Sequence, residues 1–179
     1  MNSKQVIVVR KDVPMSIGKM SGQVAHACMG VFFDWMREFT IDIPLPDGSF
    51  IRQYTLSTHS ESAVFNYIEG TFTKVVVEIA NEDELRVLLE KASERGLLTS
   101  IITDSGRTEF SEPTTTCIAI GPMSDEDCIG LTDGLKLYQD DTARKLRSYE
   151  KLLRRIKQEK SFDNIKNIIL DYENKNSTI

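Results

Sequence analysis

Apolar residues along the chain follow two kinds of pattern. Short runs rich in β-branched residues predict buried strands. The predicted strands are Gln5–Val9, Lys74–Ile79, Thr99–Thr103 and Thr115–Ile120. Longer proline-free stretches rich in apolar residues, most of them preceded by a capping residue or glycine, predict helices. The predicted helices cover residues 19–33, 62–68, 82–95 and 124–137.

The connection between the third and fourth strands determines the type of sheet. Asp104-Ser105-Gly106 is a tight-turn signal. A chain that turns directly from one strand into the next must reverse direction, so the sheet is expected to be mixed, within a small α/β sandwich. Gly121-Pro122 is expected to end the fourth strand, and Ser124 to cap a helix that runs to Leu137.

Two segments differ from this alternation. Residues 40–56 alternate polar and apolar positions on both sides of Pro46-Asp47-Gly48, which predicts an inserted β-hairpin. Beyond Tyr138, residues 142–160 hold eight basic and two acidic residues, with apolar residues at helical spacing. We therefore expect a domain at 1–138 and a basic helical extension at 139–179, with a second helix after Ser161 and a frayed end, ENKNSTI.

Length and composition argue against membrane-spanning, secreted, disulfide-rich and metal-binding proteins. The 179 residues suit one domain with an appendage, and the longest uncharged apolar stretch, 29–33, is far too short to span a membrane. No secretory signal pattern is present at the N-terminus, so the expected location is the cytoplasm. Three cysteines and two histidines without metal-type spacing predict neither a disulfide framework nor a metal site.

The net charge of −5 on its own argues against a nucleic-acid-binding protein, and no DNA partner is expected, but the charge is unevenly distributed. Residues 1–73 sum to −1, residues 74–138 to −7 and residues 139–179 to +3. The basic helix at 142–160 could neutralise the phosphates of a nucleic acid. It could equally be a solvated amphipathic helix that packs on the body of the protein or on a second subunit.

Two groups of polar residues could carry chemistry. Lys19, Gln23 and His26 share one face at the start of the first long helix, where they could handle a polarised oxygen. A solvated polar stripe would look the same. Asp104 and Arg107 follow the third strand, at the rim where α/β sheets usually bind ligands. An Asx-type turn with a solvated arginine would explain this second group as well.

Together these stretches resemble the type II peptidyl-tRNA hydrolases of archaea and eukaryotes, over about residues 4–33 and 62–138. The matching segments are VVRKDVPMSIGKMSGQVAHA (8–27), KVVVEIANEDEL (74–85), ITDSGRTEF (102–110), TCIAIGP (116–122) and GLKLY (134–138). The resemblance implies a hydrolase that cleaves the ester bond of peptidyl-tRNA without a metal or other cofactor. It also implies a three-layer α/β/α sandwich on a four-stranded mixed sheet, and often a homodimer.

The resemblance also assigns site residues. The family's active-site lysine and aspartate match Lys19 and Asp104, and its two threonines match Thr108 and Thr116. Residues expected to bind substrate are Gln23, His26 and Arg107. The lysine, the aspartate and the two threonines would all act on the ester. Lys19 would stabilise the oxyanion, and Asp104 would orient water or pair with Lys19. Thr108 and Thr116 would hold the water or the carbonyl group by hydrogen bonds.

The chain departs from the family pattern before the catalytic lysine. Pro14, Ser16 and Ile17 stand where the family usually has a second lysine and a glycine-lysine run, which lowers the positive charge at the expected RNA-facing rim. The alternative function is therefore a non-catalytic or regulatory binding protein that retains the hydrolase fold. Retention of the lysine, aspartate and threonines favours the enzyme, whereas the acidic pI of 5.2 favours the binder.

Overall fold

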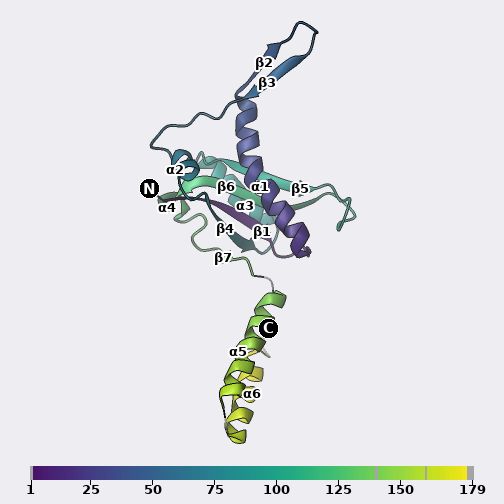
Figure 1. Cartoon of the computed structure of the whole chain (residues 1–179), viewed down its shortest axis with the longest axis vertical. Helices are drawn as coiled ribbons and strands as arrows, with labels where there is room; N and C mark the ends of the chain where they lie inside the picture. Colours follow the sequence, from purple (N-terminus) through teal and green to yellow (C-terminus); the bar gives the residue numbers. More distant parts are fainter. Residues whose placement is uncertain (1, 140, 160, 177–179) are drawn as a thin grey trace. The chain divides into compact units, whose positions relative to one another are not determined.

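The computed structural model describes residues 2–139, 141–159 and 161–176. The chain divides into two compact units, Met1–Tyr138 and Gln139–Ile179 (Figure 1). The larger unit is built on a mixed sheet, and the smaller is a pair of helices. Because the predicted active-site residues all fall in the first unit, its sheet is the frame of the site.

The sheet has the strand order β5-β6-β1-β4-β7. Its strands are β1 (Ser3–Arg10), β4 (Thr73–Ile79), β5 (Thr99–Asp104), β6 (Thr114–Ser124) and β7 (Lys136–Leu137). β1 is parallel to β4 and antiparallel to β6, and β5 is antiparallel to β6. The mixed α/β architecture is confirmed, including the reversal between the third and fourth predicted strands. The sheet has five strands, however, so the expected four-stranded sheet is wrong.

The fifth strand arises because the predicted helix at 124–137 ends early. Ser124 does cap a helix with a reciprocal capping box, but α4 covers only Asp125–Cys128. Gly130 then takes a positive φ of 66°, which ends helical geometry and turns the chain back toward the sheet. Lys136 and Leu137 pair antiparallel with β4 at its outer edge.

The fourth predicted strand also runs further than expected. β6 continues through Gly121-Pro122 to Ser124 instead of ending there. Lys4 of β1 pairs with Met123 and Val6 pairs with Ile120, so two residues of β6 lie opposite one residue of β1. This β-bulge takes up the proline, which has no backbone N–H to contribute to the ladder.

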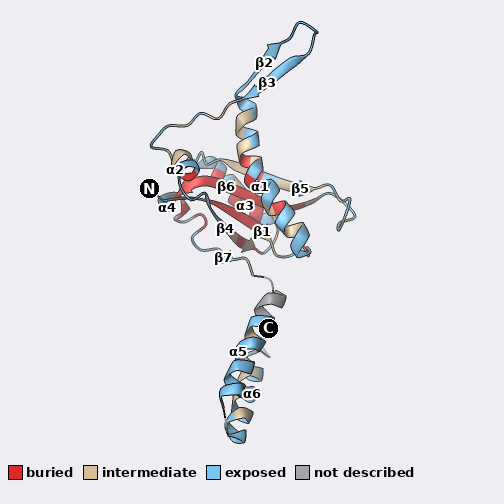
Figure 2. Ribbon diagram, viewed as in Figure 1, coloured by how far each residue is buried: buried red, intermediate tan, exposed pale blue. Residues whose placement is uncertain are grey.

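Helices cover both faces of the sheet, and alternate strand residues form a separate core on each side. On one face, Ile7 and Val9 pack under Ala27 and Val31 of α1 (Ile17–Glu38). On the other face, Val6, Val8, Ile118 and Ile120 pack against Leu85 and Leu88 of α3 (Glu82–Glu94). Figure 2 shows that the buried residues are concentrated in the central strands and in the helix surfaces that meet them.

Two smaller elements complete the first unit. α2 (Ala63–Glu69) is capped by Ser62, and its buried Tyr67 donates a hydrogen bond to Oε1 of Gln5 on β1 at 3.4 Å. The predicted hairpin is confirmed as β2 (Thr40–Pro44) and β3 (Phe50–Tyr54). It lies at the C-terminal end of α1, away from the sheet, and every residue of both strands is exposed (Figure 1).

The second unit contains α5 (Asp141–Gln158) and α6 (Phe162–Asn176), which pack on each other through Tyr149 and Tyr172, with ring centroids 5.6 Å apart. The predicted end of the basic helix at Lys160 lies outside the described residues, as do residues 177–179. Residues 173–176 are helical rather than frayed. No helix in the described part of the chain is long and apolar enough to cross a membrane.

Candidate active site

Lys19 and Asp104 form an ion pair where the first turn of α1 meets the end of β5. Ser16 caps α1 by accepting a hydrogen bond from the backbone N–H of Lys19 at 3.2 Å, which places the lysine in the first helical turn. Its ammonium group donates to Oδ2 of Asp104, the last residue of β5. The two side chains are only 13% and 11% exposed, so most of each is shielded from water.

Asp104 accepts hydrogen bonds on both carboxylate oxygens. Besides Lys19, the amide of Gln23 donates to Oδ2 at 2.9 Å, and the backbone N–H of Gly106 donates to Oδ1 at 2.9 Å. The Lys19 ammonium, followed by the Gly106 N–H and the Gln23 amide, lowers the pKa of the Asp104 carboxyl. The Asx-type turn expected from the sequence is therefore present, and the same carboxylate belongs to the polar cluster.

Gly106 is required at this turn. Its φ of 74° lies in the left-handed region, and a Cβ there would come within 2.6 Å of the Glu112 backbone. Only glycine avoids both the strain and the clash. The same turn brings Thr108 to Lys19, whose ammonium group donates to the threonine hydroxyl at 2.8 Å.

Thr116 lies behind the ion pair rather than in it. It is fully buried on β6, and its hydroxyl donates to Oε1 of Gln23 at 3.0 Å. With Oε1 held as an acceptor, the amide nitrogen of Gln23 is directed at Asp104. The structure thus connects Thr116 to Asp104 through Gln23, which lies 4% exposed between them.

The neighbouring thiol does not supply a nucleophile. Cys117 is fully buried next to Thr116, and burial raises the pKa of its thiol to about 12. Its Sγ donates to the carbonyl oxygen of Gln23 at 3.5 Å. A thiol that stays protonated near neutral pH is unreactive, so the polar cluster is the candidate for chemistry.

Two predicted substrate-binding residues lie outside this network. His26 on α1 and Arg107 in the turn after β5 are both exposed. Among the described contacts, no hydrogen bond or ion pair joins either of them to Lys19 or Asp104. Their exposed positions suit contact with a ligand that arrives from solvent.

From the sequence, no role in the site was assigned to three residues around Lys19: Ser16, Glu109 and Phe110. Phe110 places its ring 5.3 Å from the Lys19 ammonium, and Glu109 binds Ser16 at the N-cap of α1. Glu109 and Phe110 directly follow the motif threonine, but only the tertiary structure shows which residues they contact. No sequence spacing links position 16 to position 109.

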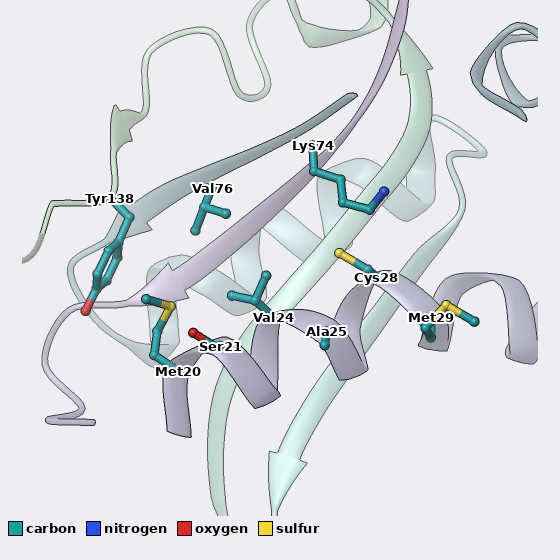
Figure 3. A pocket seen from close by; sticks show the side chains of 9 residues that line it. All are labelled: Met20, Ser21, Val24, Ala25, Cys28, Met29, Lys74, Val76 and Tyr138. Atoms are coloured by element: carbon teal, nitrogen blue, oxygen red, sulfur yellow. The ribbon is translucent and has the colours of Figure 1, made fainter. Parts of the chain in front are cut away.

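A hollow of the first unit lies on a different flank of α1. It is an apolar groove of about 590 Å³ between α1 and β4, lined chiefly by Met20, Val24, Cys28 and Val76, with Tyr138 at one end (Figure 3). Lys19 and Gln23 are not among its lining residues. The polar cluster is therefore separate from this groove, and its member Thr108 is exposed, as is the neighbouring Arg107.

Within the part of the chain that the structure describes, no group of three or more His, Cys, Asp or Glu side chains is placed to hold a metal ion. The positive charge within the cluster is the ammonium group of Lys19.

A family model and several relatives of similar sequence assign the first unit to the same family. The family model described as peptidyl-tRNA hydrolase PTH2 matches residues 3–138. The chain is 36% identical over 137 residues to the peptidyl-tRNA hydrolase of Sulfurisphaera tokodaii, covering 76% of this chain and 99% of the relative. It is 36% identical over 135 residues to that of Halobacterium salinarum, covering 75% and 99%.

A third relative, the peptidyl-tRNA hydrolase of Methanopyrus kandleri, is 34% identical over 134 residues, covering 75% of this chain and 97% of the relative. A solved structure of an Agrobacterium protein of unknown function covers 78% of this chain and 99% of its own, at 15% identity and a TM-score of 0.43, too low to add to the assignment. The matched segment contains the whole Lys19–Asp104 cluster and ends where the second unit begins. The chain belongs to the peptidyl-tRNA hydrolase PTH2 family.

Proposed function

We propose that this protein hydrolyses the ester bond of peptidyl-tRNA to release tRNA and peptide, with Lys19, Asp104 and Thr108 at the reacting atoms. Family membership supports the reaction. The observation that carries the site assignment is the shielded ion pair between Lys19 and Asp104, which the exposed Thr108 joins through a hydrogen bond to Lys19.

Hydrolysis of this ester needs a positioned water molecule and stabilisation of the charge that develops on the carbonyl oxygen. In the proposed mechanism, the Lys19 ammonium stabilises that oxyanion. Asp104 is a weak base because its pKa is lowered, so its role is to hold Lys19 and orient the water. Water adds to the carbonyl carbon and the bond to the ribose oxygen breaks. One proton of the water ends on that oxygen, which leaves as a hydroxyl group, and the other is released when the peptide's new carboxylic acid ionises.

Thr108 and Thr116 have different proposed roles. The Thr108 oxygen accepts a hydrogen bond from the Lys19 ammonium group. The hydroxyl proton of Thr108 therefore remains available for donation to the water or to the carbonyl oxygen. Thr116 is buried and contacts Gln23, so we assign it to positioning rather than to the reacting atoms. Gln23 transmits that positioning to Asp104.

The substrate contacts proposed for this site are electrostatic. Arg107 and His26 are exposed beside the cluster and are assigned to the tRNA end of the substrate, where cations release counterions from phosphates. The reaction is proposed to be metal-independent, because Lys19 already supplies a positive charge at the site. A cytoplasmic location is proposed, because peptidyl-tRNA arises in translation.

A homodimer is also proposed. Its support is the exposed apolar surface of the second unit, where Leu146 and Leu153 of α5 are 59% and 54% exposed. A symmetric pairing of two copies would cover such a surface.

The direct test is to incubate the protein with N-blocked aminoacyl-tRNA and measure deacylated tRNA, with and without EDTA. The expected result is release at the same rate under both conditions. No release would contradict the hydrolase assignment and favour the binding-protein alternative. Release that EDTA abolishes and added Mg²⁺ or Zn²⁺ restores would contradict metal independence alone.

A further inference from the structure

We propose that Ser16 and Glu109 form a latch that positions the catalytic lysine and the loop carrying Thr108. This inference rests on the proposed function, because it concerns how the same site is held in its reactive geometry. Both residues lie outside the catalytic set that the sequence predicted, and Ser16 is one of the positions where this chain departs from the family pattern.

The latch is a continuous series of hydrogen bonds from the loop to the helix. The Glu109 carboxylate accepts from the backbone N–H of Ser16 at 2.9 Å and, through its other oxygen, from the Ser16 hydroxyl. The hydroxyl oxygen accepts in turn from the backbone N–H of Lys19 at 3.2 Å. Glu109 is thereby tied to the first turn of the helix that carries the catalytic lysine.

The neighbours of Glu109 explain why this matters for catalysis. Thr108 accepts a hydrogen bond from the Lys19 ammonium, and Phe110 places its ring beside the same group. Three consecutive loop residues therefore contact Lys19 or its helix cap. Residues 106–109 and 111–112 lie outside regular secondary structure and are mostly exposed, so these contacts tie an otherwise irregular loop to α1.

The ionic state of Glu109 suits this role. The Ser16 hydroxyl and then the Ser16 N–H lower the pKa of the Glu109 carboxyl, so the carboxylate accepts both bonds at neutral pH. The pair is exposed on the surface and contributes little to global stability. Its expected effect is on the position of Lys19 and Thr108, where a displacement of about 1 Å can cost up to about 10²-fold in rate.

The first test does not depend on activity. Hydrogen exchange of backbone amides in residues 105–112 is compared between the wild type, Ser16→Ala and Glu109→Gln. The Gly106 amide, which donates to Asp104, is the most informative probe. We expect exchange in this loop to rise about tenfold in both variants, and unchanged exchange in both would overturn the latch whether or not the wild type hydrolyses substrate.

The second test measures kcat and KM on N-blocked aminoacyl-tRNA. Each single variant is expected to lower kcat about tenfold with KM within about twofold, and the double variant to lose no more than either single one. Ser16→Thr keeps the hydroxyl and should restore kcat. Ser62→Ala is the control, because it removes the N-cap of α2 without touching the site; Glu94→Gln, at an exposed position of α3, is the matched control for removal of a carboxylate.

Losses that multiply in the double variant, or an equal loss in Ser62→Ala, would show that Ser16 acts only as a helix cap and would overturn the proposal. Failure of the wild type to hydrolyse the substrate would contradict the proposed function instead, and the exchange measurement would still decide the latch.

Discussion

At the scale of single residues, the amide of Gln23 connects the buried and the exposed halves of the site. Its oxygen accepts from Thr116 and its nitrogen donates to Asp104. Thr116→Val keeps the shape but removes the donor, so Gln23 is free to rotate and Asp104 loses a fixed partner. We expect kcat to fall about tenfold with little change in KM, and Thr116→Ser to restore it.

Steady-state kinetics on N-blocked aminoacyl-tRNA provide the measurement. Thr132→Val serves as the control, since Thr132 is also buried but follows α4 at the other end of β6. Normal kcat in Thr116→Val would remove Thr116 from the positioning role.

The lowered pKa of Asp104 predicts how stability depends on pH. Its ionised form is favoured in the folded protein by Lys19, Gly106 and Gln23. The stabilisation is therefore complete above the unfolded-state pKa and is lost as pH falls through the lower folded-state value. Comparing the Tm of wild type and Asp104→Asn, we expect the gap at pH 7 to narrow below about pH 4. A gap that stays constant down to about pH 2 would contradict the ion pair.

The sequence was sufficient to predict that Lys19, Asp104 and Thr108 come together, but not that Ser16 and Glu109 join them. Lys19 and Gln23 are four residues apart on one helix, and Asp104 and Thr108 flank a turn that only glycine can make. It was insufficient for the order of contacts. Because Thr116 and Asp104 are on adjacent antiparallel strands, proximity was predictable, but the insertion of Gln23 between them depends on how α1 packs on the sheet.

At the scale of elements, the β2–β3 hairpin is the part of the first unit that is least tied to the sheet. All its strand residues are exposed, and Phe39 and Thr55 at its base are joined by a backbone hydrogen bond of 3.3 Å. Replacing residues 40–54 with a short Gly-Ser linker can therefore close the chain without moving α1. We expect kcat within about twofold of the wild type and a Tm change of only a few degrees.

The measurements are the same hydrolysis assay and thermal unfolding followed by circular dichroism. A tenfold rise in KM in the shortened protein would instead make the hairpin part of the substrate-binding surface. A fall in Tm of more than about 10 °C would show that it stabilises the domain.

The element boundaries that sequence reasoning missed share a cause. The capping box at Ser124 is a correct start signal and Gly130 is a local stop, yet only the tertiary structure shows that the chain then adds β7 to the outer edge of β4. In the same way, Gly121-Pro122 is a local stop signal that pairing with β1 overrides through a bulge. In both cases, the residues beyond the local signal pair with strands that are far away in sequence.

At the scale of the whole molecule, deleting the second unit distinguishes two roles for its basic helix, subunit assembly and RNA binding. Its basic helix exposes apolar residues as well as charges, including Leu146, Tyr149 and Leu153. We expect that deleting residues 139–179 leaves tRNA affinity and its salt dependence unchanged, and alters subunit assembly or solubility because this apolar surface is removed. Binding of labelled tRNA at two salt concentrations, with sedimentation of both proteins, provides the measurement.

An RNA role would give a different result. Every phosphate that the basic helix neutralises in the full chain contributes about 0.7 to 0.9 to the magnitude of the slope of log K against log salt. A shallower slope in the shortened protein would therefore contradict the assembly role and assign the basic face of α5 to the substrate.

The central claim is that the Lys19–Asp104 pair carries the hydrolysis of peptidyl-tRNA. The most direct measurement is kcat of Lys19→Ala and Asp104→Ala on N-blocked aminoacyl-tRNA, with Lys91→Ala and Asp83→Ala on exposed positions of α3 as matched controls. We predict a loss on the order of 10²-fold or more in each site variant, as for a group that stabilises the transition state, with folded circular dichroism spectra and unchanged controls. Wild-type kcat in both site variants would contradict the account.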